Sequence, residues 1–110
     1  MTEWVKSTEL TIRLDEQDRY NRQSMLELLT VRARKAGLAG FTVLRGVEGY
    51  GNTKTLHSEH ILSLSDNMPL LLIVIDEAEK VDAFVESNQE VLAELLLTKH
   101  EILASTRTSR

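Results

Sequence analysis

Two glycines with a cation on either side form the part of the sequence whose residue types best suit chemistry. Gly49 and Gly51 enclose Tyr50. Arg45 precedes this triplet and Lys54 follows it. Glycine adopts positive φ at little cost and lets the backbone approach a ligand, so its N–H groups can bond phosphate oxygens. The two cations would pair with a phosphate or carboxylate. The pattern therefore predicts an anion site, although a plain surface loop with solvated cations has the same residues.

A pair of histidines lies a few residues further along. His57 and His60 are three residues apart, with Glu59 between them, and such a pair suits a transition metal if the segment is helical. A third ligand is not evident, because His100 is distant in the sequence. Solvated loop histidines are the simpler interpretation, so no metal site is expected. A structural or metal-binding oligomer that uses His57 and His60 is the alternative function.

Composition excludes several other classes. The 110 residues contain no cysteine, which excludes disulfides, thiolate zinc sites, iron–sulfur clusters and a cysteine nucleophile. A formal net charge of −4, from 13 Lys and Arg against 17 Asp and Glu, argues against sequence-independent binding of nucleic acid. The longest apolar run, at 70–75, is far shorter than the roughly 20 residues that cross a bilayer. We expect a cytoplasmic protein that does not insert into membranes.

Catalytic motifs are also missing from the sequence. It contains no Ser-His-Asp order, Walker loop or metalloprotease helix. The carboxylates at Asp76, Glu77 and Glu79 are best interpreted as a helix cap and first-turn residues, which the helix dipole favours. We therefore expect a binding protein, not an enzyme, and no required cofactor.

The first half of the chain predicts a strand, a helix and a second strand. Alternating Leu10, Ile12 and Leu14 indicate a strand with one buried face. Apolar residues at helical spacing predict a helix over 24–36, with a capping box at its start and Gly37 at its end. Residues 41–44 then predict a strand that follows Gly40 and continues to Arg45. A long, exposed, flexible loop is expected over 47–60.

The second half repeats this order. The unbroken apolar run 70–75 predicts an interior strand. Asp76 is expected to cap a second helix that continues to about Glu94, with a possible interruption at Ser87 and Asn88. A final strand is expected over about 96–104, followed by a frayed tail at 105–110.

Two β-α-β units of this kind predict an α+β, ferredoxin-like βαββαβ sandwich, in which an antiparallel four-stranded sheet carries two helices on one face. The whole of 1–110 is expected to be a single domain with its core at about 9–104. Both alternating sets of residues in the run 70–75 are apolar, so something must also cover the second face of the sheet. We expect self-association through that face.

The residues around Gly49 also resemble a known family. The stretches Gly37-Leu38-Ala39-Gly40 and Thr42–Gly51 are similar to the signature of the domain-of-unknown-function 190 family, a PII-like group, and the similarity covers roughly residues 9–104. Asp18-Arg19-Tyr20 and the following helix resemble it as well. The more distant PII signalling proteins share the Gly49-Tyr50-Gly51-x-x-Lys54 pattern at the start of their long loop.

This resemblance implies a compact homotrimer whose sheets face inward. It implies that small effectors, typically adenine nucleotides such as AMP, ADP or ATP, bind in clefts between subunits and that the 47–60 loop signals occupancy to a target protein, such as a membrane transporter or an enzyme. The ligand-binding residues expected on this basis are Thr42, Arg45, Gly46, Glu48, Gly49, Tyr50, Gly51, Asn52, Lys54 and Lys99.

One departure from the PII pattern concerns the segment between the second helix and the last strand. PII proteins hold the polyphosphate there with a glycine-rich, lysine-containing loop. The segment 94–100 has no glycine, and Lys99 remains as a point charge. A smaller nucleotide such as AMP or ADP, or another anion, therefore fits as well as ATP. No tyrosine lies between Asn52 and His60 to accept covalent nucleotidylation of the PII type.

Overall fold

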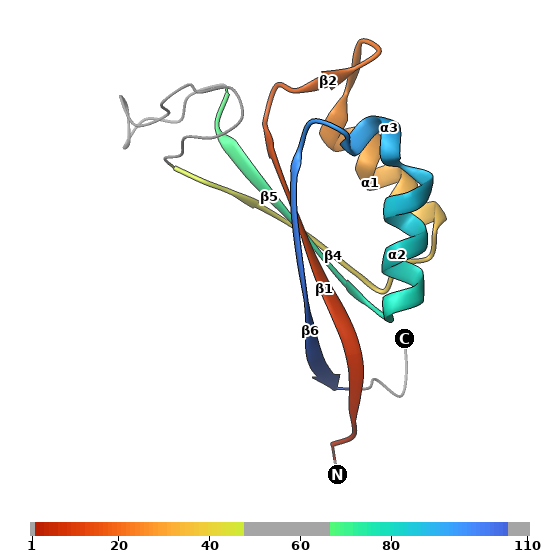
Figure 1. Cartoon of the computed structure of the whole chain (residues 1–110). Helices are drawn as coiled ribbons and strands as arrows, with labels where there is room; N and C mark the ends of the chain where they lie inside the picture. Colours follow the sequence, from red (N-terminus) through yellow and green to blue (C-terminus); the bar gives the residue numbers. More distant parts are fainter. Residues whose placement is uncertain (1, 48–66, 106–110) are drawn as a thin grey trace.

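A computed structural model describes residues 2–47 and 67–105, which form one four-stranded antiparallel sheet with helices on one of its faces (Figure 1). The strand order is β4-β5-β1-β6. The strands are β1 (Trp4–Asp15), β4 (Gly40–Arg45), β5 (Pro69–Asp76) and β6 (Leu96–Ser105). The connecting helices are α1 (Met25–Lys35), α2 (Ala78–Ser87) and the short α3 (Gln89–Leu92). This order and topology confirm the predicted ferredoxin-like fold.

The hydrophobic core lies between the sheet and the helices. Alternate residues in the central parts of β1 and β5 point into it, and each is at most 3% exposed: Leu10, Ile12, Leu14, Leu70, Leu72 and Val74. Burial of a Leu, Val or Phe side chain contributes about 1.5–3 kcal/mol each, so this layer supplies most of the driving force for folding. The fully buried side chains include Leu10, Ile12, Leu72 and Val74 from the sheet and Leu29, Ala33, Val81 and Phe84 from the helices.

Local signals set both ends of α1, and of the predicted capping box the half made by Ser24 is present. Ser24 is the N-cap, and its hydroxyl accepts a hydrogen bond from the Glu27 N–H at 3.2 Å. Gly37 follows the last turn with φ of +74°, a conformation that costs an L side chain about 1–2 kcal/mol.

The start of the second helix differs from the prediction. Glu77, not Asp76, is the N-cap residue of α2, and it makes no side-chain capping bond. Asp76 is the last residue of β5, and its largely buried carboxylate accepts hydrogen bonds from the backbone N–H of Ala39 at 2.8 Å and of Glu77 at 2.7 Å. This side chain therefore fixes the α1–β4 connection to the end of β5, a tertiary role that capping preferences do not predict.

The second helix is interrupted where the sequence allowed it. The break falls at Asn88, which is only 4% exposed and separates α2 from α3. Its amide donates to the Phe84 carbonyl at 2.7 Å and accepts from the Arg32 guanidinium at 2.9 Å. The possible interruption is confirmed, and its stabilising partner lies on α1.

The structure contains more strand residues than the sequence predicted, in two places. A two-stranded hairpin of β2 (Arg19–Tyr20) and β3 (Gln23–Ser24) precedes α1, with positive φ at Asn21 and Arg22. The first strand is also longer than the pattern at 10–14 indicated. Its first residues pair with the end of β6 as far as Trp4 and Ser105, beyond the end of β5 (Figure 1). Ser105, expected to be frayed, is therefore the last residue of a strand.

Most of the expected 47–60 loop, and the tail after Ser105, lie outside the described residues. Across 2–47 and 67–105, the helices include none that is long and apolar enough to span a membrane. That 1–110 forms a single domain stays a prediction.

Candidate functional site

Three of the predicted binding residues lie at or next to the edge strand β4. Its register with β5 places Thr42 opposite Ile73 and Arg45 opposite Leu70. Because paired residues share a face, Thr42 lies on the side away from the helices and Arg45 on the helix side. The Gly46 N–H donates to the Pro69 carbonyl at 2.7 Å and is therefore already used within the chain.

Arg45 is held by Glu16, the residue that follows β1. The Nε of Arg45 lies 3.1 and 3.2 Å from the two carboxylate oxygens of Glu16, and Nη2 lies 3.0 Å from Oε1. This hydrogen-bonded guanidinium lowers the pKa of Glu16 from its usual value of 4.5, and a bond from the Met68 N–H acts in the same direction. Burial opposes the shift but does not outweigh it. The predicted anion-binding arginine thus already holds an anion of its own chain.

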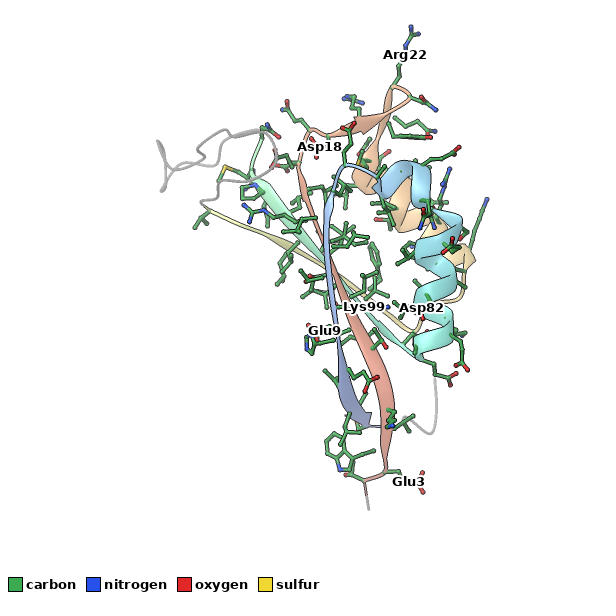
Figure 2. The ribbon with its side chains drawn as sticks, viewed as in Figure 1. Glu3, Glu9, Asp18, Arg22, Asp82 and Lys99 are labelled. Atoms are coloured by element: carbon green, nitrogen blue, oxygen red, sulfur yellow. The ribbon has the colours of Figure 1, made fainter. Side chains whose placement is uncertain are left out.

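Lys99 lies on the other edge of the sheet, in β6. Its Nζ forms an ion pair with Asp82 of α2 at 3.1 Å, and both side chains are exposed (Figure 2). An exposed pair of this kind is worth about 0–1 kcal/mol, so Lys99 can change partners at little cost. Because β5 and β1 lie between β4 and β6, one chain does not bring Lys99 next to Arg45 or Thr42.

The remaining predicted binding residues lie outside the described residues. These are Glu48, Gly49, Tyr50, Gly51, Asn52 and Lys54, together with the weak metal candidates His57 and His60. Within the part of the chain that the structure describes, no group of three or more His, Cys, Asp or Glu side chains is placed to hold a metal ion. The metal-binding alternative therefore has no support from the described residues and stays untested at the two histidines.

The face of the sheet away from the helices carries both apolar and polar side chains, and we call it the open face. Strand register assigns to it a central apolar row from β5, flanked by apolar residues of both edge strands. Leu44 and Leu96 on those edges are 49% and 53% exposed. A hydrogen bond between the Thr11 and Thr98 hydroxyls also lies on this face. The open face includes Leu44, Leu71, Ile73, Ile75 and Leu96, with Thr42, Thr11, Thr98, Glu9, Arg13 and His100 among them.

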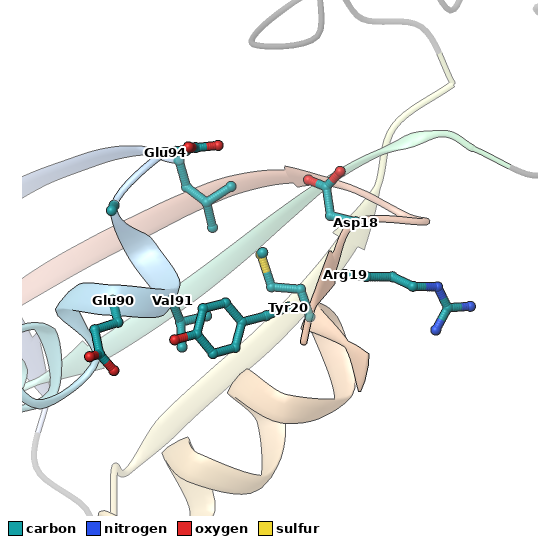
Figure 3. A pocket seen from close by; sticks show the side chains of 9 residues that line it. Asp18, Arg19, Tyr20, Glu90, Val91 and Glu94 are labelled. Atoms are coloured by element: carbon teal, nitrogen blue, oxygen red, sulfur yellow. The ribbon is translucent and has the colours of Figure 1, made fainter. Parts of the chain in front are cut away.

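A cavity that the sequence did not predict lies at the hairpin end of the helix layer. Its volume is about 380 Å³, and its lining includes Asp18, Tyr20, Glu90 and Glu94 (Figure 3). Among the described residues, Arg19 is the one cation in the lining, and in Figure 3 its side chain extends away from Glu90. The described part of the lining, with three carboxylates against one guanidinium, does not favour a phosphate. Asp18, Arg19 and Tyr20, which the family resemblance singled out, all line this cavity, but their types alone did not indicate it.

Comparison with protein families gives one match over most of the chain. The model of the DUF190 family, described as "Uncharacterized ACR, COG1993", matches residues 7–104. A UPF0166 protein of Aquifex aeolicus is 34% identical over 82 residues, which is 74% of this chain and 78% of the relative. UPF0166 protein MJ1524 of Methanocaldococcus jannaschii is 27% identical over 88 residues, covering 80% of this chain and 81% of the relative.

Solved structures with the same fold include PII-like proteins. CPII of Thiomonas intermedia K12, a nitrogen regulatory PII-like protein with bound ADP, AMP and bicarbonate, aligns with a TM-score of 0.71 and 19% identity over 94% of this chain and 92% of its own. A candidate PII-like signalling protein of Thermus thermophilus, TTHA0516, aligns with a TM-score of 0.63 and 16% identity over 94% and 92%. At these identities the similarity establishes a PII-like fold.

Proposed function

The chain belongs to the DUF190 family of uncharacterised proteins, and from this premise we propose that it is a PII-like regulatory protein that binds an adenine nucleotide between copies of itself. The fold supports the regulatory class, because solved PII-like structures align over more than nine-tenths of the chain. The ligand class comes from CPII, whose structure contains ADP, AMP and bicarbonate. The protein would act by binding, without catalysis.

One observation supports a site between copies more than any other: the predicted cations stand on opposite edges of the sheet. Arg45 is on β4 and Lys99 is on β6, with two strands between them. Three strand spacings of about 4.8 Å, with the core packed against the intervening strands, separate these two edges within one chain. Placing the β4 edge of one copy beside the β6 edge of the next would bring both cations to one ligand.

A contact between two different edges is heterologous, and a heterologous contact that closes on itself makes a ring. The open face would then turn inward, where the copies cover each other's apolar rows. We propose the homotrimer as that ring. In this arrangement residues 47–60, which begin two positions after Arg45, would signal occupancy of the cleft to a target protein such as a transporter or an enzyme.

Calorimetry tests the ligand. AMP, ADP, ATP and cyclic AMP are titrated into the wild type, Arg45→Ala and the control Arg34→Ala, which removes the same charge from an exposed position on α1. We expect at least one nucleotide to bind with a Kd below about 1 mM, and Arg45→Ala to weaken it about tenfold, as for one charge-assisted hydrogen-bonding partner. Arg34→Ala should bind as the wild type does. Absence of binding for all four nucleotides would contradict the proposal, and equal weakening in both variants would exclude Arg45 from the site.

A further inference from the structure

Glu16 binds the Nε and Nη2 edge of the Arg45 guanidinium, which is the edge that an incoming anion would use. The Nε and Nη2 donors of a guanidinium form a planar fork that fits a carboxylate and a phosphate equally well. In this chain the fork is directed at Glu16, with all three N···O distances between 3.0 and 3.2 Å. Both side chains are about one-third exposed, so an anion from solution can reach the pair.

Glu16 is itself fixed in place by backbone hydrogen bonds. Its N–H donates to the Met68 carbonyl at 2.9 Å, and its Oε1 accepts from the Met68 N–H at 3.4 Å. The next residue, Gln17, donates its N–H to the Asn67 side chain at 3.0 Å. Because these bonds hold the carboxylate beside Arg45, its effective concentration at the guanidinium is far above that of a free anion in solution.

We propose that Glu16 is an internal competitor for Arg45 and sets the affinity of the anion site. This inference rests on the proposed function and adds a residue that neither the family signature nor the predicted site included. An effector phosphate that binds the Nε and Nη2 edge must displace the Glu16 carboxylate. Displacing the carboxylate costs every ligand the same free energy. A monoanion, which Arg45 attracts weakly, would therefore not bind detectably, whereas a phosphate monoester dianion would still bind.

The substitution Glu16→Gln removes the negative charge of the side chain and keeps its shape. The glutamine amide keeps the length of the side chain, and its oxygen can still accept from the Met68 N–H, but its negative charge is gone. The control is Glu79→Gln in the first turn of α2, which changes the net charge equally at an exposed position. We expect Glu16→Gln to bind AMP and ADP about fivefold more tightly than the wild type, corresponding to an ion pair of about 1 kcal/mol. Glu79→Gln should match the wild type.

The double variant Glu16→Gln/Arg45→Ala identifies the route of the effect. If Glu16 acts by occupying Arg45, the gain in nucleotide affinity disappears when Arg45 is absent. If the gain came only from a change in the electrostatic potential of the protein, it would remain in the double variant. Thermal unfolding of each variant at pH 7 checks that the fold is retained.

The outcomes distinguish this inference from the proposed function. If the wild type binds a nucleotide and Glu16→Gln binds it equally or more weakly, the competition is wrong, while the proposed function stands. Weaker binding would mean that Glu16 positions Arg45. If neither protein binds any nucleotide, the proposed function fails, and inorganic pyrophosphate then serves as the probe. Tighter binding of pyrophosphate to Glu16→Gln than to Glu79→Gln would support the competition, and equal or absent binding would overturn it.

Discussion

Arg32 on α1 donates a hydrogen bond from Nη1 to the Oδ1 of Asn88, 2.9 Å away, at the break between α2 and α3. The Nδ2 of the same amide donates to the Phe84 carbonyl at 2.7 Å, which leaves that side chain with partners at both ends. Because Asn88 is buried, each of these bonds replaces one that water would otherwise make. The pair thereby joins the two helices of the layer at the point where the second helix is interrupted.

Asn88→Ala should lower the free energy of unfolding by about 2 kcal/mol, because it removes both bonds and leaves buried polar groups without partners. Arg32→Ala should cost less, about 1 kcal/mol, since it leaves the bond to Phe84 intact. Urea unfolding of the two variants measures this order. Equal costs would mean that the Arg32 bond, and not the bond to Phe84, stabilises the break.

This helix break illustrates what the sequence can predict and what it cannot. Local signals were sufficient for α1, because the Ser24 cap and Gly37 act within a few residues of the helix ends. Ser87 and Asn88 indicated a possible break in the second helix, but the stabilising Arg32 is 56 residues away in the sequence. Asp76 looked like a helix cap for the same reason: its partner Ala39 is 37 residues away. The sequence pattern predicted the order of the elements, the ferredoxin-like fold and the helices on one face of the sheet, but not these tertiary hydrogen bonds.

The candidate site shows the same limit. Arg45 was predicted from its position before the glycines, but Glu16, 29 residues earlier, had no local feature to distinguish it from other glutamates. Lys99 was predicted by comparison with a PII loop, and its partner Asp82 became evident only when α2 packed beside β6. The β2–β3 hairpin was missed because its turn, Asn21-Arg22, lacks the glycine that usually marks such a turn.

The Glu16–Arg45 pair should make stability depend on pH. Folding lowers the pKa of Glu16 below 4.5, so the folded protein holds the charged form more tightly than the unfolded chain does. The pair therefore stabilises the protein fully above about pH 4.5, and this contribution disappears as the pH falls through the lower, folded pKa. Urea unfolding of the wild type and Glu16→Gln should differ at pH 7 and converge in acid. A difference that is unchanged at low pH would show that shape, not charge, is what Gln fails to reproduce.

The open face should control association. Ile73 lies on that face at the centre of the sheet, and an aspartate there would place a charge in the proposed interface between copies. We expect the wild type to sediment as a trimer at micromolar concentration and Ile73→Asp to sediment as a folded monomer. The control is Val31→Asp, at a half-exposed position on α1, which should remain trimeric. A wild type that sediments as a monomer would contradict the ring, and dissociation of both variants would mean that the open face is not the interface.

The tip of the β2–β3 hairpin offers a stabilising substitution. Asn21 and Arg22 are the two central residues of the turn, with φ of 51° and 70°, the conformation of a type I′ turn. Asparagine suits the first position, but an arginine at the second bears a steric cost that glycine would not. Arg22 is exposed at the tip (Figure 2), so Arg22→Gly removes no packing and should raise the free energy of unfolding by about 0.5–1 kcal/mol. Arg22→Ala removes the same charge but keeps the Cβ atom, so it should give no gain. If alanine stabilises the protein as much as glycine does in urea unfolding, the benefit comes from removing the charge and the φ argument is wrong.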